Sequence, residues 1–251
     1  QMLSKIIYCD NAGGSQIPIQ VINSLTKMLT NYYVQPFANN NISKQLTDEI
    51  HNAKHITNII LNSSNGYIIY SSSSTQNVYN LANSMKKNLN DIGGEIILAD
   101  FNHESMLTPF ERLFKDQNMK KKIDIFDYSS SDDEKSDKLL LKWWHLKKID
   151  NNYYIDYSKL YSMINEKTRL VVIPHVSNIL GNILDIKTII QKIRKINPAT
   201  KIMVDGVAYM AHGKIDVLDL DVDFYLVSFY KFCGLRVSAL YIRDSSILNS
   251  I

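Results

Sequence analysis

Short apolar runs alternate with amphipathic segments along almost the whole chain. The runs are rich in β-branched residues, which is typical of strands buried on both faces of a parallel sheet. We expect such strands at 66–70, 94–100, 123–128, 168–177, 201–206 and 222–227. Between them, apolar residues recur at the spacing of one helix face. Strand, helix and strand in repetition predict an α/β fold with a mostly parallel sheet between helices.

Three of the predicted helices carry a clear apolar face. Pro18 opens the first, whose shared face holds Val21, Ile22, Leu25, Met28 and Leu29. The second follows a serine-rich turn and presents Val78, Leu81, Ala82, Met85 and Leu89. Asp185 caps the third, which presents Ile186, Ile189, Ile190 and Ile193. Residues 129–137, "SSSDDEKSD", interrupt the pattern, and we expect a mobile surface insertion there.

Composition narrows the class of protein only a little. The 251 residues are 45% hydrophobic and 21% charged, which fits one large domain spanning 1–251. A net charge of +3 is too small to imply a nucleic-acid partner. Cys9 and Cys233 form no paired motif, so we expect a reducing compartment, the cytoplasm. No apolar run approaches the length of a membrane span, and the start lacks the layout of a signal peptide.

Polar residues gather where the predicted strands end. In open α/β sheets the ligand site lies beyond the carboxyl ends of the strands. The segments there contain hydroxyls, carboxylates, imidazoles, amides and a lysine; they are Ser71–Thr75, Asp100–His103, His175–Asn178, Asp205 and Ser228–Lys231.

The turn "SSSSTQN" has two interpretations. Hydroxyls and free N–H groups at a helix N-terminus bind anions, so Thr75 and Ser74 are candidates to hold a phosphate. The alternative is a simple N-cap in a serine-rich loop. Neither GxxxxGK(S/T) nor GxGxxG occurs, so a nucleoside triphosphate or a dinucleotide is not the expected ligand.

Asp205 and Lys231 follow two successive strands and also leave two alternatives. They form a buried salt bridge, or they serve pyridoxal phosphate, in which Asp keeps the ring nitrogen protonated and Lys forms a Schiff base. That cofactor also needs a phosphate cup, a flat group against the ring and a polar partner for the ring oxygen. Thr75 with Ser228, His103 and Asn178 have the right chemistry for these three needs.

The segment "VDGVAYMAHGKIDVLDLDVDFYLVSFYKFCG" resembles the cofactor-lysine region of class V aminotransferases, most closely their cysteine desulfurase-like branch. "YCDNAGGSQIP" resembles that family's N-terminal "DNAA" segment, and "SSSSTQNVYNLA" its phosphate-binding turn. "DFNHESMLTPF" is similar to the segment of its ring-stacking histidine, and "HVSNILGNILDI" to its "SNxxG" strand end. The resemblance covers nearly the whole chain, except around residues 120–145.

The resemblance implies a role for each matching residue. Lys231 would be the Schiff-base lysine, Asp205 the partner of the pyridine nitrogen and His103 the group stacked on the ring. Asn178 would bond the ring hydroxyl or the substrate. The phosphate ligands would be Thr75, Ser228 and Ser74, and we expect the hydroxyl of Tyr230, which replaces the family's usual histidine, to reach the phosphate as well. The fold would be the large domain of a type I pyridoxal phosphate enzyme, in a homodimer with active sites at the interface.

The sequence also departs from the family pattern. Ala208 stands where many relatives have glutamine, and Tyr230 replaces the usual histidine before the lysine. "FCGLR" replaces a common Gly-Pro turn. Few residues follow the strand "SALYIR", so we expect the family's C-terminal small domain, with its substrate-binding arginine and desulfurase cysteine loop, to be absent.

These features leave three functional hypotheses. The first is an enzyme that acts on an amino acid, like a cysteine desulfurase, a selenocysteine lyase or a class V aminotransferase, with Lys231 moving the α-proton. The second is a truncated or degenerate homologue that serves as a non-catalytic binding or interaction subunit. The third is that the chain is one piece of a longer protein.

Other reactive side chains have simpler interpretations. Cys233, two residues after Lys231, has two interpretations, a persulfide-forming thiol or a packed residue. Free cysteines are often buried, so we expect Cys233 and Cys9 to be packed inside the protein. His51 and His55 have the i, i+4 spacing of a metal pair but no third ligand nearby, so an exposed helix face is expected and no metal site is predicted.

Overall fold

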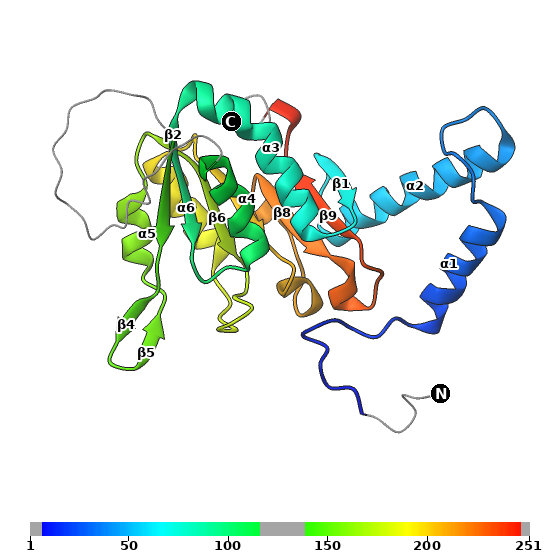
Figure 1. Ribbon diagram of the computed structural model, residues 1–251, viewed down its shortest axis with the longest axis horizontal. Coiled ribbons are helices and arrows are strands. Elements are labelled where there is room, and N and C mark those ends of the chain that lie inside the picture. The colour runs from blue at the N-terminus through cyan, green and yellow to red at the C-terminus, as the bar shows by residue number, and fades with distance from the viewer. Residues whose placement is uncertain (1–6, 116–138, 247–251) are drawn as a thin grey trace.

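A computed structural model describes residues 7–115 and 139–246 (Figure 1). The strand predicted at 123–128 and the insertion predicted at 129–137 lie outside these residues. The remaining predicted strands are all present, and a seven-stranded sheet runs through the molecule in the order β1-β9-β8-β7-β6-β2-β3. The strands are β1 (Tyr67–Ser71), β2 (Gly94–Ala99), β3 (Leu139–Trp144), β6 (Thr168–Pro174), β7 (Lys201–Asp205), β8 (Phe224–Ser228) and β9 (Ser238–Ile242).

The sheet is mostly parallel, as predicted. Strands β3, β2, β6, β7 and β8 pair in parallel, whereas β9 lies antiparallel between β8 and β1. All strands except β9 therefore end at the same edge of the sheet. At this edge the register aligns Ser71, Ser238 and Ser228 across the three strands β1, β9 and β8.

Helices cover both faces of the sheet. On one face lie α3 (Ser74–Ile92) and α4 (Glu104–Lys115), and on the other α5 (Tyr157–Met163), α6 (Ile186–Ile196) and α7 (Val217–Leu220). Neighbouring residues of a strand belong to opposite cores: Val172 packs on the α3 side and Val171 on the α6 side. This arrangement explains why the strands read as continuous apolar runs.

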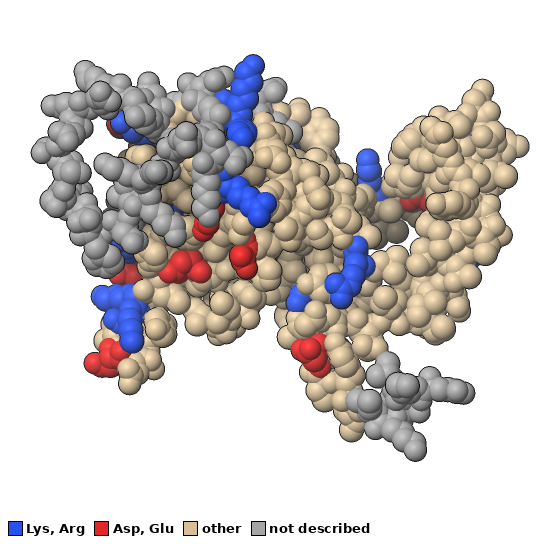
Figure 2. All heavy atoms as spheres, viewed as in Figure 1, with Lys and Arg blue, Asp and Glu red and all other residues tan. Residues whose placement is uncertain are grey.

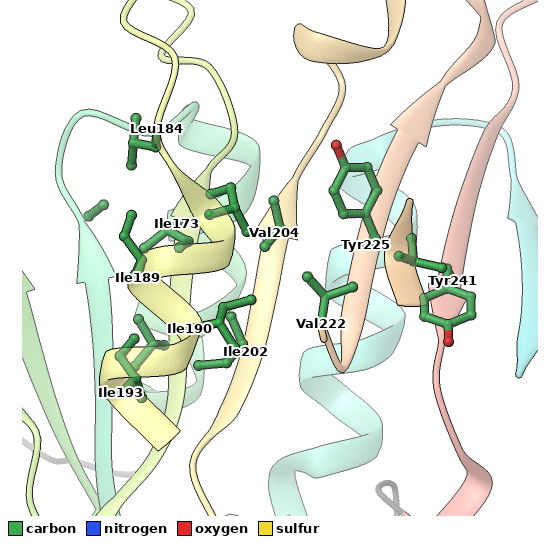
Figure 3. Close-up of a cluster of buried hydrophobic side chains, with 14 of the residues drawn as sticks. Ile173, Leu184, Ile189, Ile190, Ile193, Ile202, Val204, Val222, Tyr225 and Tyr241 are labelled. Carbon is green, nitrogen blue, oxygen red and sulfur yellow. The ribbon is translucent and has the colours of Figure 1, made fainter. Parts of the chain in front are cut away.

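The predicted helix faces of α3 and α6 are buried. All five predicted apolar residues of α3 and all four isoleucines predicted for the buried face of α6 are in the two cores. Figure 3 shows Ile189, Ile190 and Ile193 against β6 and β7. Each fully buried isoleucine stabilises the fold by roughly 1.5–3 kcal/mol. Asp185 caps α6 as expected, because its carboxylate accepts the N–H of Thr188 at 3.1 Å.

Helices α1 (Ile19–Asn31) and α2 (Asn41–Ile60) project from the body as an arm (Figure 1). The predicted helix after Pro18 is confirmed, but it has no buried residue, and Ile22, Met28 and Leu29 are exposed. His51 and His55 lie exposed on α2, as expected. Figure 2 shows acidic and basic side chains interspersed over the visible face of the body.

The remaining ordered elements are short. Strands β4 (Lys147–Ile149) and β5 (Asn152–Tyr154) form a separate hairpin. Two 3-10 turns, η2 (Tyr209–Ala211) and η3 (Phe229–Phe232), follow β7 and β8 at the carboxyl edge of the sheet. Among the helices in the described ranges, none has both the length and the apolarity to cross a bilayer.

Candidate active site

A cavity of about 330 Å³ opens at the carboxyl edge of the sheet. All eight residues predicted for the site line it: Ser74, Thr75, His103, Asn178, Asp205, Ser228, Tyr230 and Lys231. They come from the ends of β1, β2, β6, β7 and β8, so the parallel topology brings together residues that are up to 157 positions apart in the chain (231 − 74). Their individual roles remain predictions.

The serine-rich turn provides the N-cap of a helix, and its binding of a phosphate stays a prediction. Ser73 is the N-cap of α3, and its hydroxyl accepts the N–H of Gln76 at 3.1 Å. Ser74 and Thr75 are therefore not needed as caps. The Ser74 hydroxyl is buried without a hydrogen-bond partner among the described residues. An unpaired buried hydroxyl costs folding free energy, and a hydrogen bond to a ligand in the cavity would remove that cost.

His103 lies at the start of α4 with its side chain exposed to the cavity. The backbone N–H of Ser105 donates to His103 Nδ1 at 3.1 Å, and the Ser105 hydroxyl lies 2.8 Å from the same nitrogen. Nδ1 therefore acts as an acceptor, which places the proton of the neutral ring on Nε2. The Asn102 side chain fixes the backbone by accepting the His103 N–H at 2.7 Å.

Asp205 ends β7 and is buried, with 7% of its surface exposed. One carboxylate oxygen accepts the N–H of Val207 at 3.0 Å. Burial raises the pKa of Asp205, while that hydrogen bond and electrostatic interactions with His103 and Lys231 lower it. Asp205 and Lys231 form no ion pair in the described chain, so the interpretation of the two as a buried salt bridge is wrong.

Lys231 lies in η3, directly after β8, and is only partly buried. Its ammonium group donates to the carbonyl of Ala12 and lies 5.2 Å from the centre of the Tyr230 ring. The N-terminal segment is tied to the same turn, because Ser15 N–H donates to the Tyr230 carbonyl at 2.9 Å. The "DNAGGS" segment thus closes one side of the cavity.

A second, larger cavity of about 780 Å³ adjoins the first and shares Lys231, Asn178 and Ala208 with it. Ala208 offers no side-chain hydrogen bond to either cavity. Cys233 lines the second cavity and is exposed, as is Cys9, so the prediction that both are packed inside is wrong. The reason is local: η3 breaks the strand alternation, and Cys233 takes a left-handed φ of 69° at its end.

The prediction from sequence missed two residues that bear on the site. Arg236 lines the 330 Å³ cavity from the loop after η3, where no periodic pattern marks it. His175 lies beneath the cavity, buried between Tyr209 and Tyr225, with its N–H bonded to the Asp205 carbonyl at 2.8 Å. The sequence places it at a strand end and indicates no role for it.

Comparison with known proteins agrees with this architecture. The family described as Aminotransferase class-V matches residues 7–140 and 133–249. The aminotransferase-like protein FGM3 of Gibberella zeae is 35% identical over 94% of this chain and 53% of its own length. A cysteine desulfurase of Wigglesworthia glossinidia brevipalpis is 29% identical over 92% and 51%. The apo structure of a cysteine desulfurase from Thermococcus onnurineus NA1 superposes with a TM-score of 0.77 at 20% identity, over 97% and 55%.

The chain therefore belongs to the class V aminotransferase family and is cysteine desulfurase-like within it. Its fold is that of the pyridoxal phosphate-dependent cysteine desulfurases. The chain spans about half the length of the curated relatives it matches.

Proposed function

We propose that the protein is a pyridoxal phosphate-dependent enzyme that acts on an amino acid, as a cysteine desulfurase, a selenocysteine lyase or a class V aminotransferase does. One observation carries the proposal. A single cavity combines a lysine, a buried carboxylate and a hydroxyl-lined helix N-terminus. Members of this family typically use pyridoxal phosphate and bind amino-acid substrates.

The residues of the cavity fit this cofactor. The unpaired Ser74 hydroxyl, Thr75, Ser228 and Tyr230 supply donors for a phosphate at the N-terminus of α3. Asp205 supplies a buried anion for a protonated ring nitrogen, and Asn178 an amide for the ring hydroxyl. Pyridoxal phosphate, when bound, acts as the electron sink that makes the α-carbon of an amino acid acidic.

Lys231 has two tasks in this proposal. It attaches the cofactor through Nζ and moves the proton at the substrate α-carbon. The Nζ atom is held at the cavity by the Ala12 carbonyl and the Tyr230 ring, which keeps a flexible side chain in place. The ammonium must lose a proton before it can act as a base or nucleophile.

His103 is proposed to lie flat against the cofactor ring. Its ring is held by two contacts from Ser105 at one nitrogen, so its orientation is fixed before any ligand binds. The exposed face of the ring offers the flat surface that stacking needs. We further propose that residues 1–251 form one cofactor-binding large domain, which the single seven-stranded sheet supports.

Exchange of the α-proton tests the proposed activity. The chain is incubated in D₂O with pyridoxal phosphate and single amino acids, and the α-proton signal is followed by NMR. We expect loss of the signal for at least one amino acid, and no loss with Lys231→Ala. Alanine formed from cysteine, with the sulfur released as sulfide by an added thiol reductant, would identify a desulfurase.

Ala208 favours a second candidate, a homologue that keeps the fold as a non-catalytic binding or interaction subunit. The side chain at this position faces both cavities and lacks the hydrogen-bonding group that many relatives have there. This candidate predicts that no amino acid exchanges its α-proton, even when the cofactor is bound. Exchange with any amino acid would exclude it.

A further inference from the structure

Arg236 occupies a short loop that joins η3 to β9. The loop is held by its own backbone: Phe229 N–H donates to the Val237 carbonyl at 2.9 Å, and Gly234 N–H donates to the Phe229 carbonyl at 2.8 Å. Arg236 therefore starts from a fixed backbone position directly beside the end of β8. Its side chain lines the 330 Å³ cavity together with Lys231.

Among the described residues, the guanidinium group of Arg236 has no charged partner. It lies 5.5 Å from the centre of the Tyr230 ring, a cation–π contact. It makes no ion pair or hydrogen bond with another residue in the ranges 7–115 and 139–246. Its five N–H donors are therefore available, and a planar guanidinium matches the oxygens of a phosphate or a carboxylate.

The order of the strands places Arg236 on the hydroxyl side of the cavity. Across the edge of the sheet, the turn after β1 comes first, then the start of β9, then the end of β8 and then Asp205 on β7. Ser71, Ser238 and Ser228 lie next to one another in this register. Two strand spacings, about 10 Å, separate β9 from β7. Arg236 thus lies beside Ser72–Thr75 and away from the only acidic residue among those described that line this cavity, Asp205.

We propose that Arg236 is an additional ligand of the cofactor phosphate, on the side opposite the carboxylate that takes the ring nitrogen. This inference rests on the proposed function, since it assigns one more residue to the same cofactor. The cavity would then hold a dianion with the unpaired Ser74 hydroxyl, the N-terminus of α3 and one fully charged guanidinium. Arg236 would supply a permanent charge, which Tyr230 cannot supply where relatives have histidine.

Inorganic phosphate tests this assignment without the cofactor. Calorimetric titration compares the unmodified chain with Arg236→Gln and with Arg112→Gln, a control whose guanidinium lies 5.4 Å over the Tyr79 ring outside the cavity. Loss of one charge-assisted contact should weaken phosphate binding about tenfold to a hundredfold in Arg236→Gln. Arg112→Gln should bind as the unmodified chain does. Equal affinity in all three proteins, or no phosphate binding at all, would overturn the assignment.

Pyridoxal phosphate and pyridoxal separate the two possible sources of the anion. We expect Arg236→Gln to weaken the binding of pyridoxal phosphate by the same factor. The affinity for pyridoxal, which lacks the phosphate, should change by no more than about twofold. If pyridoxal phosphate binds unchanged while an amino acid or acetate binds more weakly, Arg236 serves a carboxylate and the assignment is wrong. Phosphate binding that depends on Arg236, together with failure of pyridoxal phosphate to react with Lys231, would refute the proposed function and leave the anion site standing.

Discussion

At the residue scale, the buried carboxylate of Asp205 lowers the stability of the cofactor-free fold but supplies an anion for the cofactor site. Its carboxylate is buried, burial raises its pKa, and one N–H bond from Val207 only partly compensates the lost hydration. Because the folded-state pKa is raised, ionisation costs folding free energy as the pH rises from the unfolded pKa through the folded pKa. A protonated ring nitrogen beside it would remove that cost.

Asp205→Asn should separate these effects. We expect the cofactor-free variant to unfold at higher urea at pH 7, with a gain of about 1 kcal/mol. Its affinity for pyridoxal phosphate should fall about tenfold or more, because the ring nitrogen loses its anion. Urea unfolding and cofactor titration measure the two quantities. A variant that is less stable and binds the cofactor normally would contradict this role.

His175 is a second buried ionisable residue, and its backbone N–H donates to the Asp205 carbonyl at 2.8 Å. Its ring stacks on Tyr209 with centres 3.6 Å apart and accepts or donates a 2.7 Å bond to the Tyr225 hydroxyl. Burial lowers the pKa of His175 from 6.5 to about 4. The residue is therefore neutral in the folded protein at pH 7.

Acid should therefore destabilise the fold through His175. With a depressed folded-state pKa, its contribution is present above pH 6.5 and is lost as the pH falls towards 4. The loss amounts to about 3 kcal/mol across this window. His175→Gln should lower the free energy of unfolding at pH 7. It should also reduce the change in that free energy between pH 6.5 and 4.5, as measured by urea unfolding. If the free energy of unfolding depends on pH in the same way in the variant and in the unmodified chain, His175 is not the source of the acid destabilisation.

At the element scale, neighbouring hydroxyl groups at the N-terminus of α3 have different roles, helix capping and lining of the cavity. Ser73 caps the helix, whereas Ser74 and Thr75 line the cavity without serving as caps. Stability and ligand binding should therefore respond to different substitutions within three consecutive residues.

Ser73→Ala and Thr75→Ala form a matched pair for this division. Ser73→Ala should lower the free energy of unfolding by about 1 kcal/mol, because the N–H of Gln76 loses its acceptor. Thr75→Ala should change the free energy of unfolding by less than about 0.5 kcal/mol and weaken the binding of pyridoxal phosphate about tenfold. Urea unfolding and cofactor titration of both variants decide this. Similar effects of the two substitutions on both quantities would show that the turn acts as one structural unit.

Hydrophobic periodicity predicted most elements because buried strands and helix faces leave a direct mark on the sequence. The isoleucines of α6 and the apolar face of α3 are buried where predicted. The antiparallel direction of β9 left no such mark, since a strand buried on both faces has the same apolar pattern in either direction.

The site was predictable where a side chain lies at the end of a strand, as for Asp205, and missed where a loop carries it, as for Arg236. Cys233 is exposed, against the burial expected from its residue type, because it follows a helical turn, η3.

At the scale of the whole molecule, one sheet edge gathers every predicted site residue, but the oligomeric state stays a prediction. The family resemblance implies a homodimer with interfacial active sites. Light scattering of the chain at several concentrations measures this directly. We expect about twice the mass of 28.8 kDa. A mass that stays at one chain at every concentration would contradict a homodimer.

The central claim is that Lys231 holds pyridoxal phosphate in this cavity. The most direct measurement is the absorbance near the visible edge after the cofactor is added, followed by borohydride reduction and mass spectrometry of the peptides. The account predicts a band in the unmodified chain, added mass on the peptide with Lys231, and neither in Lys231→Ala. Lys192→Ala, which removes a lysine 5.0 Å over the Tyr161 ring, should behave as the unmodified chain does. A band that persists in Lys231→Ala, or never forms in the unmodified chain, would contradict the claim.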